Sequence, residues 1–172
     1  MRPEEIRVIY DVLRERSPCN FLVFGLGDDS PMWACTNQDG YTLFIEDDED
    51  WIERVLEKQP SLNVQQYTYD TTRKDWRRLL ELPSELEMEL PSSVRDRDWD
   101  VILVDAPSGY HPEHPGRMQS IYMAAELAEE GTDIFVHDIN RAVEKAYSNK
   151  FLGDWEWVKD VDRLRHYSVC GR

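Results

Sequence analysis

Polar and glycine residues follow the predicted buried strands of this 172-residue sequence at the points where the strands end. Their types suit ligand binding and proton transfer: a Gly-x-Gly turn, isolated acids and a histidine. The residues are Gly25 and Gly27, Glu46, Asp105, and His137 with Asp138. Because the carboxyl ends of parallel strands meet at one edge of a sheet, these residues are expected to form a single site.

Strands and helices alternate along the chain, which predicts an α/β fold with right-handed crossovers and a mostly parallel sheet. Strands are expected at residues 21–24, 41–45, 64–69, 101–104 and 134–136. Helices are expected near residues 6–13, 51–56, 76–80, 117–129 and 141–151. Residues 155–170 read as two strands that close the sheet as an antiparallel hairpin. Residues 1–172 are interpreted as one domain, with an N-terminal helix within 1–18 and a loosely ordered, variable connection over 70–98.

The segment Gly25-x-Gly27-x-x-Ser30 is typical of a nucleotide-binding loop between a strand and a helix. Glycines let the backbone approach a ligand closely, and the helix that starts at Ser30 offers free N–H groups. Glu46 lies 21 residues after Gly25, at the end of the next strand, where an acid accepts hydrogen bonds from ribose hydroxyls. Asp47 is the alternative acid for that role.

Two features favour S-adenosyl-L-methionine (SAM) over a dinucleotide as the cofactor. Asp28 and Asp29 follow the glycines and would repel a pyrophosphate, whereas a ligand with sulfonium and ammonium groups tolerates them. The closing hairpin also matches the antiparallel strands of SAM-dependent methyltransferases. The predicted fold is therefore a Rossmann-like class I SAM-dependent methyltransferase fold, and a NAD-linked oxidoreductase is the alternative.

Asp105, His137 and Asp138 are the candidate catalytic residues. Asp105 stands where such enzymes place an active-site acid, and His137 is a candidate general base near neutral pH. Asp105 and Asp138, with Asn140, also offer the oxygen ligands that a hard divalent cation prefers, which makes a metal a second candidate cofactor. The simpler alternatives are a capping acid, a packed histidine and an accidental group of oxygens.

The loop at residues 106–116 contains three prolines and two glycines, which indicates a fixed shape suited to substrate binding. Arg117 is expected to contact a substrate carboxylate, because a guanidinium pairs with a carboxylate through two hydrogen bonds. The alternative is a first-turn arginine paired with surface acids. The candidate substrate-binding residues are Tyr110, His111, His114, Arg117, Asn140 and Arg141.

The composition narrows the function classes further. The chain has 35 acidic and 20 basic residues and a formal net charge of −15, which argues against a non-specific nucleic-acid binder and against adhesion to an anionic membrane. Cys19, Cys35 and Cys170 show no metal-binding spacing and are interpreted as small buried residues. No apolar run reaches the roughly 20 residues of a membrane span. As written, the chain is expected to be cytoplasmic.

At these motifs the sequence resembles the glucuronoxylan 4-O-methyltransferase family of plant xylan biosynthesis, with its irregular-xylem relatives. The most specific blocks are Pro115-Gly-Arg-Met118 and His137-Asp-x-Asn-Arg141, followed by Glu144. Further resembling blocks lie at residues 17–27, 29–33, 42–46 and 99–110. Two positions depart from the family, which usually has His at Asp28 and Lys or Arg at Ser108. The plant Golgi anchor and a longer insert are also missing, so the chain is expected to be a minimal relative.

The resemblance implies SAM-dependent transfer of a methyl group to the 4-hydroxyl of glucuronic acid, with a divalent cation as a candidate cofactor. The expected partner is a uronic-acid-containing glycan, without nucleic acid or membrane. The location would be the Golgi lumen if an N-terminal anchor was trimmed. The alternatives are a non-catalytic relative that binds a glycan or a partner enzyme, and a methyltransferase for a small molecule or protein.

Overall fold

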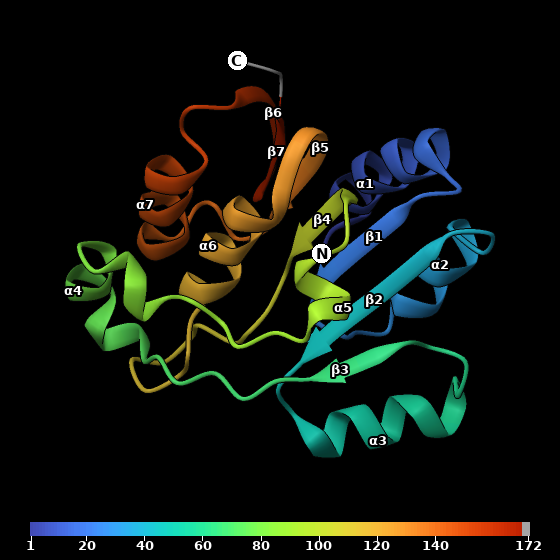
Figure 1. Ribbon diagram of the computed structural model, residues 1–172, viewed down its shortest axis with the longest axis horizontal. Coiled ribbons are helices and arrows are strands. Elements are labelled where there is room, and N and C mark those ends of the chain that lie inside the picture. The colour runs from blue at the N-terminus through green and yellow to red at the C-terminus, as the bar shows by residue number, and fades with distance from the viewer. Residues whose placement is uncertain (170–172) are drawn as a thin grey trace.

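The computed structural model describes residues 1–169, in which a seven-stranded sheet carries helices on both faces (Figure 1). The strand order is β3-β2-β1-β4-β5-β7-β6, with β7 antiparallel to β5 and β6 and all other pairs parallel. This confirms the predicted mostly parallel sheet and its closing hairpin. The strands are β1 (Asn20–Phe24), β2 (Tyr41–Glu46), β3 (Val64–Gln66), β4 (Trp99–Val104), β5 (Ala128–Val136), β6 (Glu156–Val161) and β7 (Leu164–Ser168).

The connections between these strands are mostly helical. In residues 1–169, none of the helices is long and apolar enough to cross a membrane. The helices are α1 (Pro3–Arg16), α2 (Ser30–Thr36), α3 (Glu49–Lys58), α4 (Trp76–Leu80), α5 (Ser92–Arg95), α6 (Met118–Leu127) and α7 (Ala142–Phe151), with 3-10 turns η1 (Arg73–Asp75) and η2 (Pro83–Glu85).

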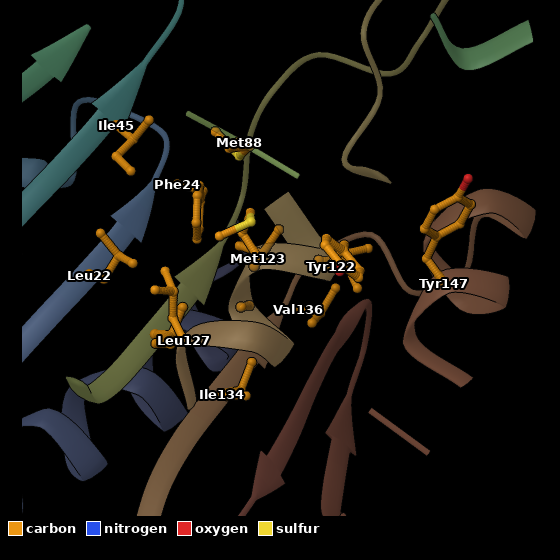
Figure 2. Close-up of a cluster of buried hydrophobic side chains, with 14 of the residues drawn as sticks. Leu22, Phe24, Ile45, Met88, Tyr122, Met123, Leu127, Ile134, Val136 and Tyr147 are labelled. Carbon is orange, nitrogen blue, oxygen red and sulfur yellow. The ribbon is translucent and has the colours of Figure 1, made fainter. Parts of the chain in front are cut away.

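Two hydrophobic clusters lie on the two faces of the sheet, because successive strand side chains point to opposite sides. Leu22 and Phe24 of β1 belong to the cluster under α5, α6 and α7. Figure 2 shows part of this cluster, where Met123 of α6 lies over the sheet. Phe21 and Val23 point the other way, into the cluster formed with α1, α2 and α3. The central strands are thus buried on both faces, and their ends remain available for a site.

Residues 70–98 are better packed than the sequence analysis predicts. The expected helix is present as α4, but the rest of the segment also contributes to the core. Leu86, Met88 and Leu90 are buried at alternate positions, and Val94 of α5 is buried beside them. That alternation places three apolar side chains on the sheet side of an extended segment, so the prediction of a loose connection was wrong.

Several boundaries also differ from the predictions. The fifth strand starts at Ala128 rather than residue 134, since the early part of β5 pairs with Trp99 of β4. The third strand ends at Gln66 rather than at residue 69, whereas α2 starts at Ser30 as expected. Cys19 is buried as predicted, whereas Cys35 is exposed. Cys170 lies outside the described residues.

Candidate active site

The ends of the central strands bring the predicted residues to one edge of the sheet. β1 lies between β2 and β4, so Gly25 donates its backbone N–H to Ile45 O at 2.8 Å and Asp105 donates to Phe24 O at 2.9 Å. His137 donates its backbone N–H to Val104 O at 3.0 Å. The Gly turn, Asp105 and His137 therefore follow adjacent strands, as the strand-end pattern predicts.

The Gly-x-Gly turn needs glycine at its first position. Gly25 has φ +125°, and a Cβ there would lie 3.1 Å from the Cβ of Ala106, so a larger residue would push the loop away from the end of β4. Ser30 accepts a hydrogen bond from the Gly27 N–H through Oγ at 2.9 Å, which fixes the loop at the start of α2. Asp28 is exposed beside this loop.

Glu46 ties the end of β2 to the same turn. The carboxylate is buried; Oε2 accepts from Leu26 N at 2.9 Å, and Oε1 accepts from Asp47 N at 2.9 Å and Asp48 N at 3.1 Å. Burial, followed by a hydrogen bond with Glu46 and its charge, raises the pKa of Asp47 to about 7. The two neighbouring carboxyl groups therefore differ: Glu46 is fixed by three backbone N–H groups, and Asp47 retains its proton close to neutral pH.

A cavity of about 80 Å³ lies between these elements. Its walls include Met1, the Gly25–Gly27 turn, Glu46 and Asp105. A buried acid after β2 and a glycine turn after β1 are the groups that SAM requires, so the residues present fit this cofactor. Met1 is among the lining residues, and the cavity is smaller than the several hundred Å³ that are common for cofactor pockets.

Asp105 is held from two sides by cationic and hydrogen-bonding groups. Its Oδ1 lies 2.7 Å from Nδ1 of His137 and 3.0 Å from Nη2 of Arg117. Burial acts to raise the pKa of Asp105, but the hydrogen bond from His137 and the Arg117 charge outweigh it and lower that pKa. The carboxylate is therefore ionised at neutral pH, and its side chain is 29% exposed.

Asp138 is buried and surrounded by arginines. Its carboxylate lies 3.1 Å from Nη2 of Arg117, 2.9 Å from Nη2 of Arg141 and 3.2 Å from Nη1 of Arg163. The residue has φ 61°, in the left-handed region. A buried acid is stable only when it is well paired, and three guanidinium groups supply that pairing. This position suits an anchor better than a group that contacts substrate.

Arg117 is placed differently from the sequence expectation of a substrate contact. Its side chain is 6% exposed, Nη2 contacts both Asp105 and Asp138, and Nη1 donates to His137 O at 2.8 Å. A guanidinium engaged in this way offers little surface to a substrate carboxylate. The structure gives Arg117 the role of an internal cation that joins the ends of β4 and β5.

The predicted metal ligands do not fit a divalent cation in this arrangement. Asp105, His137 and Asp138 have candidate ligand atoms within 4.8 Å of one another. The Nη2 atom of Arg117 lies 3.0 and 3.1 Å from one oxygen of each carboxylate, however, and an ion bound there would face that positive group. Asn140, the third expected oxygen ligand, is exposed.

Glu5 of α1 also reaches this cluster, although it was not among the predicted site residues. The side chain is completely buried, and Oε1 lies 3.3 Å from Nε2 of His137. Burial acts to raise the pKa of Glu5, but hydrogen bonds from Arg2 N and Arg163 N, with the nearby charges of His137 and Arg163, lower it. In the sequence, Glu5 looks like an ordinary first-turn acid of a helix, so only the fold reveals this contact.

The loop at 106–116 forms the exposed side of the site. Tyr110 is 70% exposed, and its ring lies 4.5 Å from Cζ of Arg141. His114 contacts Ser108 Oγ through Nδ1 at 2.7 Å, and its ring packs edge-on against His111. Tyr110 and His111 thus belong to the loop and Arg141 contacts it, whereas Arg117 is buried. The direct roles predicted for all these residues stay predictions.

The chain also matches a known protein family. A family described as IRX15/IRX15L/GXM matches residues 4–88 and 82–167 of the chain. The chain belongs to this family. The resemblance inferred from the strand-end motifs is thereby confirmed.

Family relatives from Arabidopsis thaliana align over nearly the whole chain. Glucuronoxylan 4-O-methyltransferase 2 is 46% identical over an alignment that covers 96% of this chain and 64% of the relative. Arabinogalactan O-methyltransferase 2 is 42% identical over an alignment that covers 96% of this chain and 66% of that relative. The chain thus spans less than two thirds of the length of the first relative.

Solved structures show the same fold at low sequence identity. The SAM-dependent O-methyltransferase from Thermotoga maritima has a TM-score of 0.57 and 14% identity, and the match covers all of this chain and 67% of that one. The fibrillarin pre-rRNA processing protein from Methanococcus jannaschii has a TM-score of 0.57 and 12% identity, and the match covers 99% of this chain and 77% of that one. The predicted methyltransferase fold is confirmed.

Proposed function

We propose that this protein transfers the methyl group of SAM to a hydroxyl of glucuronic acid in a glycan, with O4 as the expected position. One observation carries the proposal: the ionised Asp105 lines the cavity beside the Gly25–Gly27 turn, with one carboxylate oxygen fixed by two neighbours. Relatives named glucuronoxylan 4-O-methyltransferases support glucuronate as the acceptor. Relatives named for arabinogalactan support a glycan more broadly.

The cofactor would lie between the first two strand ends. SAM supplies a methyl group on a sulfonium, which is already a good leaving group, so the main task of the chain is alignment. Gly25 and Gly27 let the backbone approach the ligand. Glu46 would accept ribose hydroxyl hydrogen bonds through Oε2, which accepts one backbone N–H, whereas Oε1 accepts two.

Asp105 is the better candidate than His137 for the proton acceptor. Both ring nitrogens of His137 face carboxylate oxygens, from Asp105 and Glu5, so the ring is engaged on both sides. The contacts of Asp105 to His137 and Arg117 both use Oδ1, which leaves Oδ2 for the acceptor hydroxyl. That proton moves to Oδ2 as the new C–O bond forms, because alkylation makes the hydroxyl strongly acidic.

The acceptor would lie under the exposed loop. Tyr110 offers a ring that can stack on a sugar, and Arg141 lies beside it with a side chain 18% exposed. Arg141 is therefore the proposed partner of the uronate carboxylate in place of the buried Arg117. The Arg141 guanidinium supplies a local positive charge beside Tyr110, in a chain whose net charge of −15 repels an acidic glycan at long range.

The direct test is incubation of the protein with SAM and a panel of uronic-acid oligosaccharides, followed by mass spectrometry. We expect a mass gain of one methylene on glucuronate-containing acceptors and formation of S-adenosylhomocysteine. Neutral oligosaccharides of the same length are the control. Methylation of neutral sugars alone would reject glucuronate, and SAM binding without methyl transfer to any acceptor would favour a non-catalytic relative.

A further inference from the structure

Glu5 is a buried carboxylate with one partner at the N-cap of its own helix and two beside the candidate active site. Removal of a carboxylate from water is unfavourable unless hydrogen bonds or opposite charges compensate for it. Oε2 accepts from Arg2 N at 2.5 Å, and Oε1 accepts from Arg163 N at 3.0 Å. The third neighbour is Nε2 of His137, at 3.3 Å from Oε1. The contacts with His137 and Arg163 connect α1 with the end of β5 and the start of β7.

The His137 ring lies between two carboxylates. Nδ1 contacts Asp105 Oδ1 at 2.7 Å, and Nε2 lies 3.3 Å from Glu5 Oε1 without hydrogen-bond geometry, a contact that attracts when the ring carries both protons. Because imidazole is flat and rigid, attraction at one nitrogen constrains the direction of the other. The His137 ring therefore joins the Asp105 carboxylate to a group in the first turn of the N-terminal helix.

Arg163 strengthens this connection from the hairpin side. Its backbone N–H binds Glu5, while its Nη1 lies 3.2 Å from Asp138 Oδ1. Arg163 therefore contacts both Glu5, which faces Nε2 of His137, and Asp138, which follows His137 in the chain. Glu5 is consequently fixed from the hairpin as well as from its own helix, as a group that orients another side chain must be.

We propose that Glu5 is a positioning residue: it holds the His137 ring so that Nδ1 binds Oδ1 of Asp105 and Oδ2 points at the acceptor hydroxyl. The proposal rests on the proposed methyl transfer. Glu5 itself does not touch the reacting atoms. Its effect passes through His137 to Asp105, and small errors in the position of a reacting group reduce rates strongly.

The test compares Glu5→Gln with Glu4→Gln, an exposed acid in the same helical turn. The Glu5 variant keeps the shape of the side chain and removes the charge that faces His137, and its one amide oxygen can accept from one of the two backbone N–H groups. We expect kcat to fall about 10- to 100-fold, while the KM for the acceptor and the Kd for SAM change less than about twofold. Glu4→Gln should match the unmodified protein in all three quantities.

A second measurement reports on the ring without requiring activity. In protein labelled with 15N-histidine, the His137 ring signals, assigned by their loss in His137→Asn, should shift in Glu5→Gln and stay unchanged in Glu4→Gln. Shifted ring signals together with an inactive unmodified protein would reject the proposed reaction but keep the positioning role. Unchanged ring signals together with an unchanged kcat in Glu5→Gln would overturn the positioning role. A lower Tm with a normal kcat would also overturn it. If Glu5→Gln does not fold, Glu5→Asp, which retains the charge one methylene further away, should show the same selective loss of kcat, and normal kcat there would also overturn the role.

Discussion

Nη2 of Arg117 lies 3.0 Å from Oδ1 of Asp105, although a loop of eleven residues separates them in the chain. The loop returns because Gly116 donates its backbone N–H to Ser108 O at 2.9 Å. The arginine that follows is thereby buried beneath the loop and against the end of β4. Because the loop folds back in this way, Arg117 pairs with Asp105, the proposed proton acceptor, instead of with the substrate as expected.

The roles of Arg117 and Arg141 can be separated with two acceptors, a uronic acid and its neutral methyl ester. Arg141→Ala is expected to reduce kcat/KM for the acid much more than for the ester, because a carboxylate loses its partner. Arg117→Ala should reduce both equally and lower the unfolding free energy by about 1–3 kcal/mol, since Asp105 and Asp138 lose one shared cation but keep their contacts with His137, Arg141 and Arg163. A selective loss for the acid in Arg117→Ala would return the substrate role to that residue.

Asp105→Asn should abolish turnover and leave SAM affinity close to that of the unmodified protein. The amide keeps the size of the carboxylate but cannot accept the hydroxyl proton. Calorimetry for SAM binding and a methyl-transfer assay provide the two measurements. Retention of more than about a tenth of kcat would exclude Asp105 as the proton acceptor, because general-base residues contribute roughly 100-fold or more.

Glu46→Ala is expected to weaken the binding of SAM and S-adenosylhomocysteine by roughly 1–3 kcal/mol, as buried hydroxyls and the Leu26 N–H lose their acceptor. Calorimetry measures both affinities. Glu49→Gln, an exposed acid at the start of α3, is the matched control and should bind normally. Normal SAM affinity in a folded Glu46→Ala variant would remove Glu46 from the cofactor site.

The stability of the protein should fall as pH rises from about 4 to about 7, in part through Asp47. Its pKa is raised in the folded state, so within this range the folded chain binds a proton that the unfolded chain has already lost. Asp47→Asn should therefore raise the unfolding free energy by about 1 kcal/mol at pH 8 and have little effect at pH 4, with the magnitude reduced by partial solvent screening. Thermal unfolding at the two pH values measures the difference. An equal gain at both would assign the effect to packing instead.

Removal of divalent cations should leave the Tm unchanged. The guanidinium of Arg117 already supplies the positive charge between Asp105 and Asp138. Thermal unfolding before and after exhaustive chelation, and again with added Mg²⁺ or Mn²⁺, provides the measurement. A chelator-induced fall in Tm that added cation reverses would show that a metal stabilises the fold after all.

The sequence alone predicted the order of strands and helices, because strand-length apolar runs and helical spacing are local properties of the chain. It also predicted that Gly25, Glu46, Asp105 and His137 would meet, since the carboxyl ends of parallel strands must lie at one edge. Local pattern was less informative for residues 70–98, where charged residues surround alternating buried ones such as Leu86 and Met88.

The tertiary structure decided which of these polar residues face a ligand and which face one another. A sequence pattern assigns a residue to a strand end but does not give the direction of a long side chain or the identity of its partners. Arg117 is buried because the 106–116 loop folds over it, and Glu5 reaches His137 because α1 packs beside β5 and β7. Both contacts join segments distant in the chain, and their energies depend on burial, which exists only after the sheet has formed.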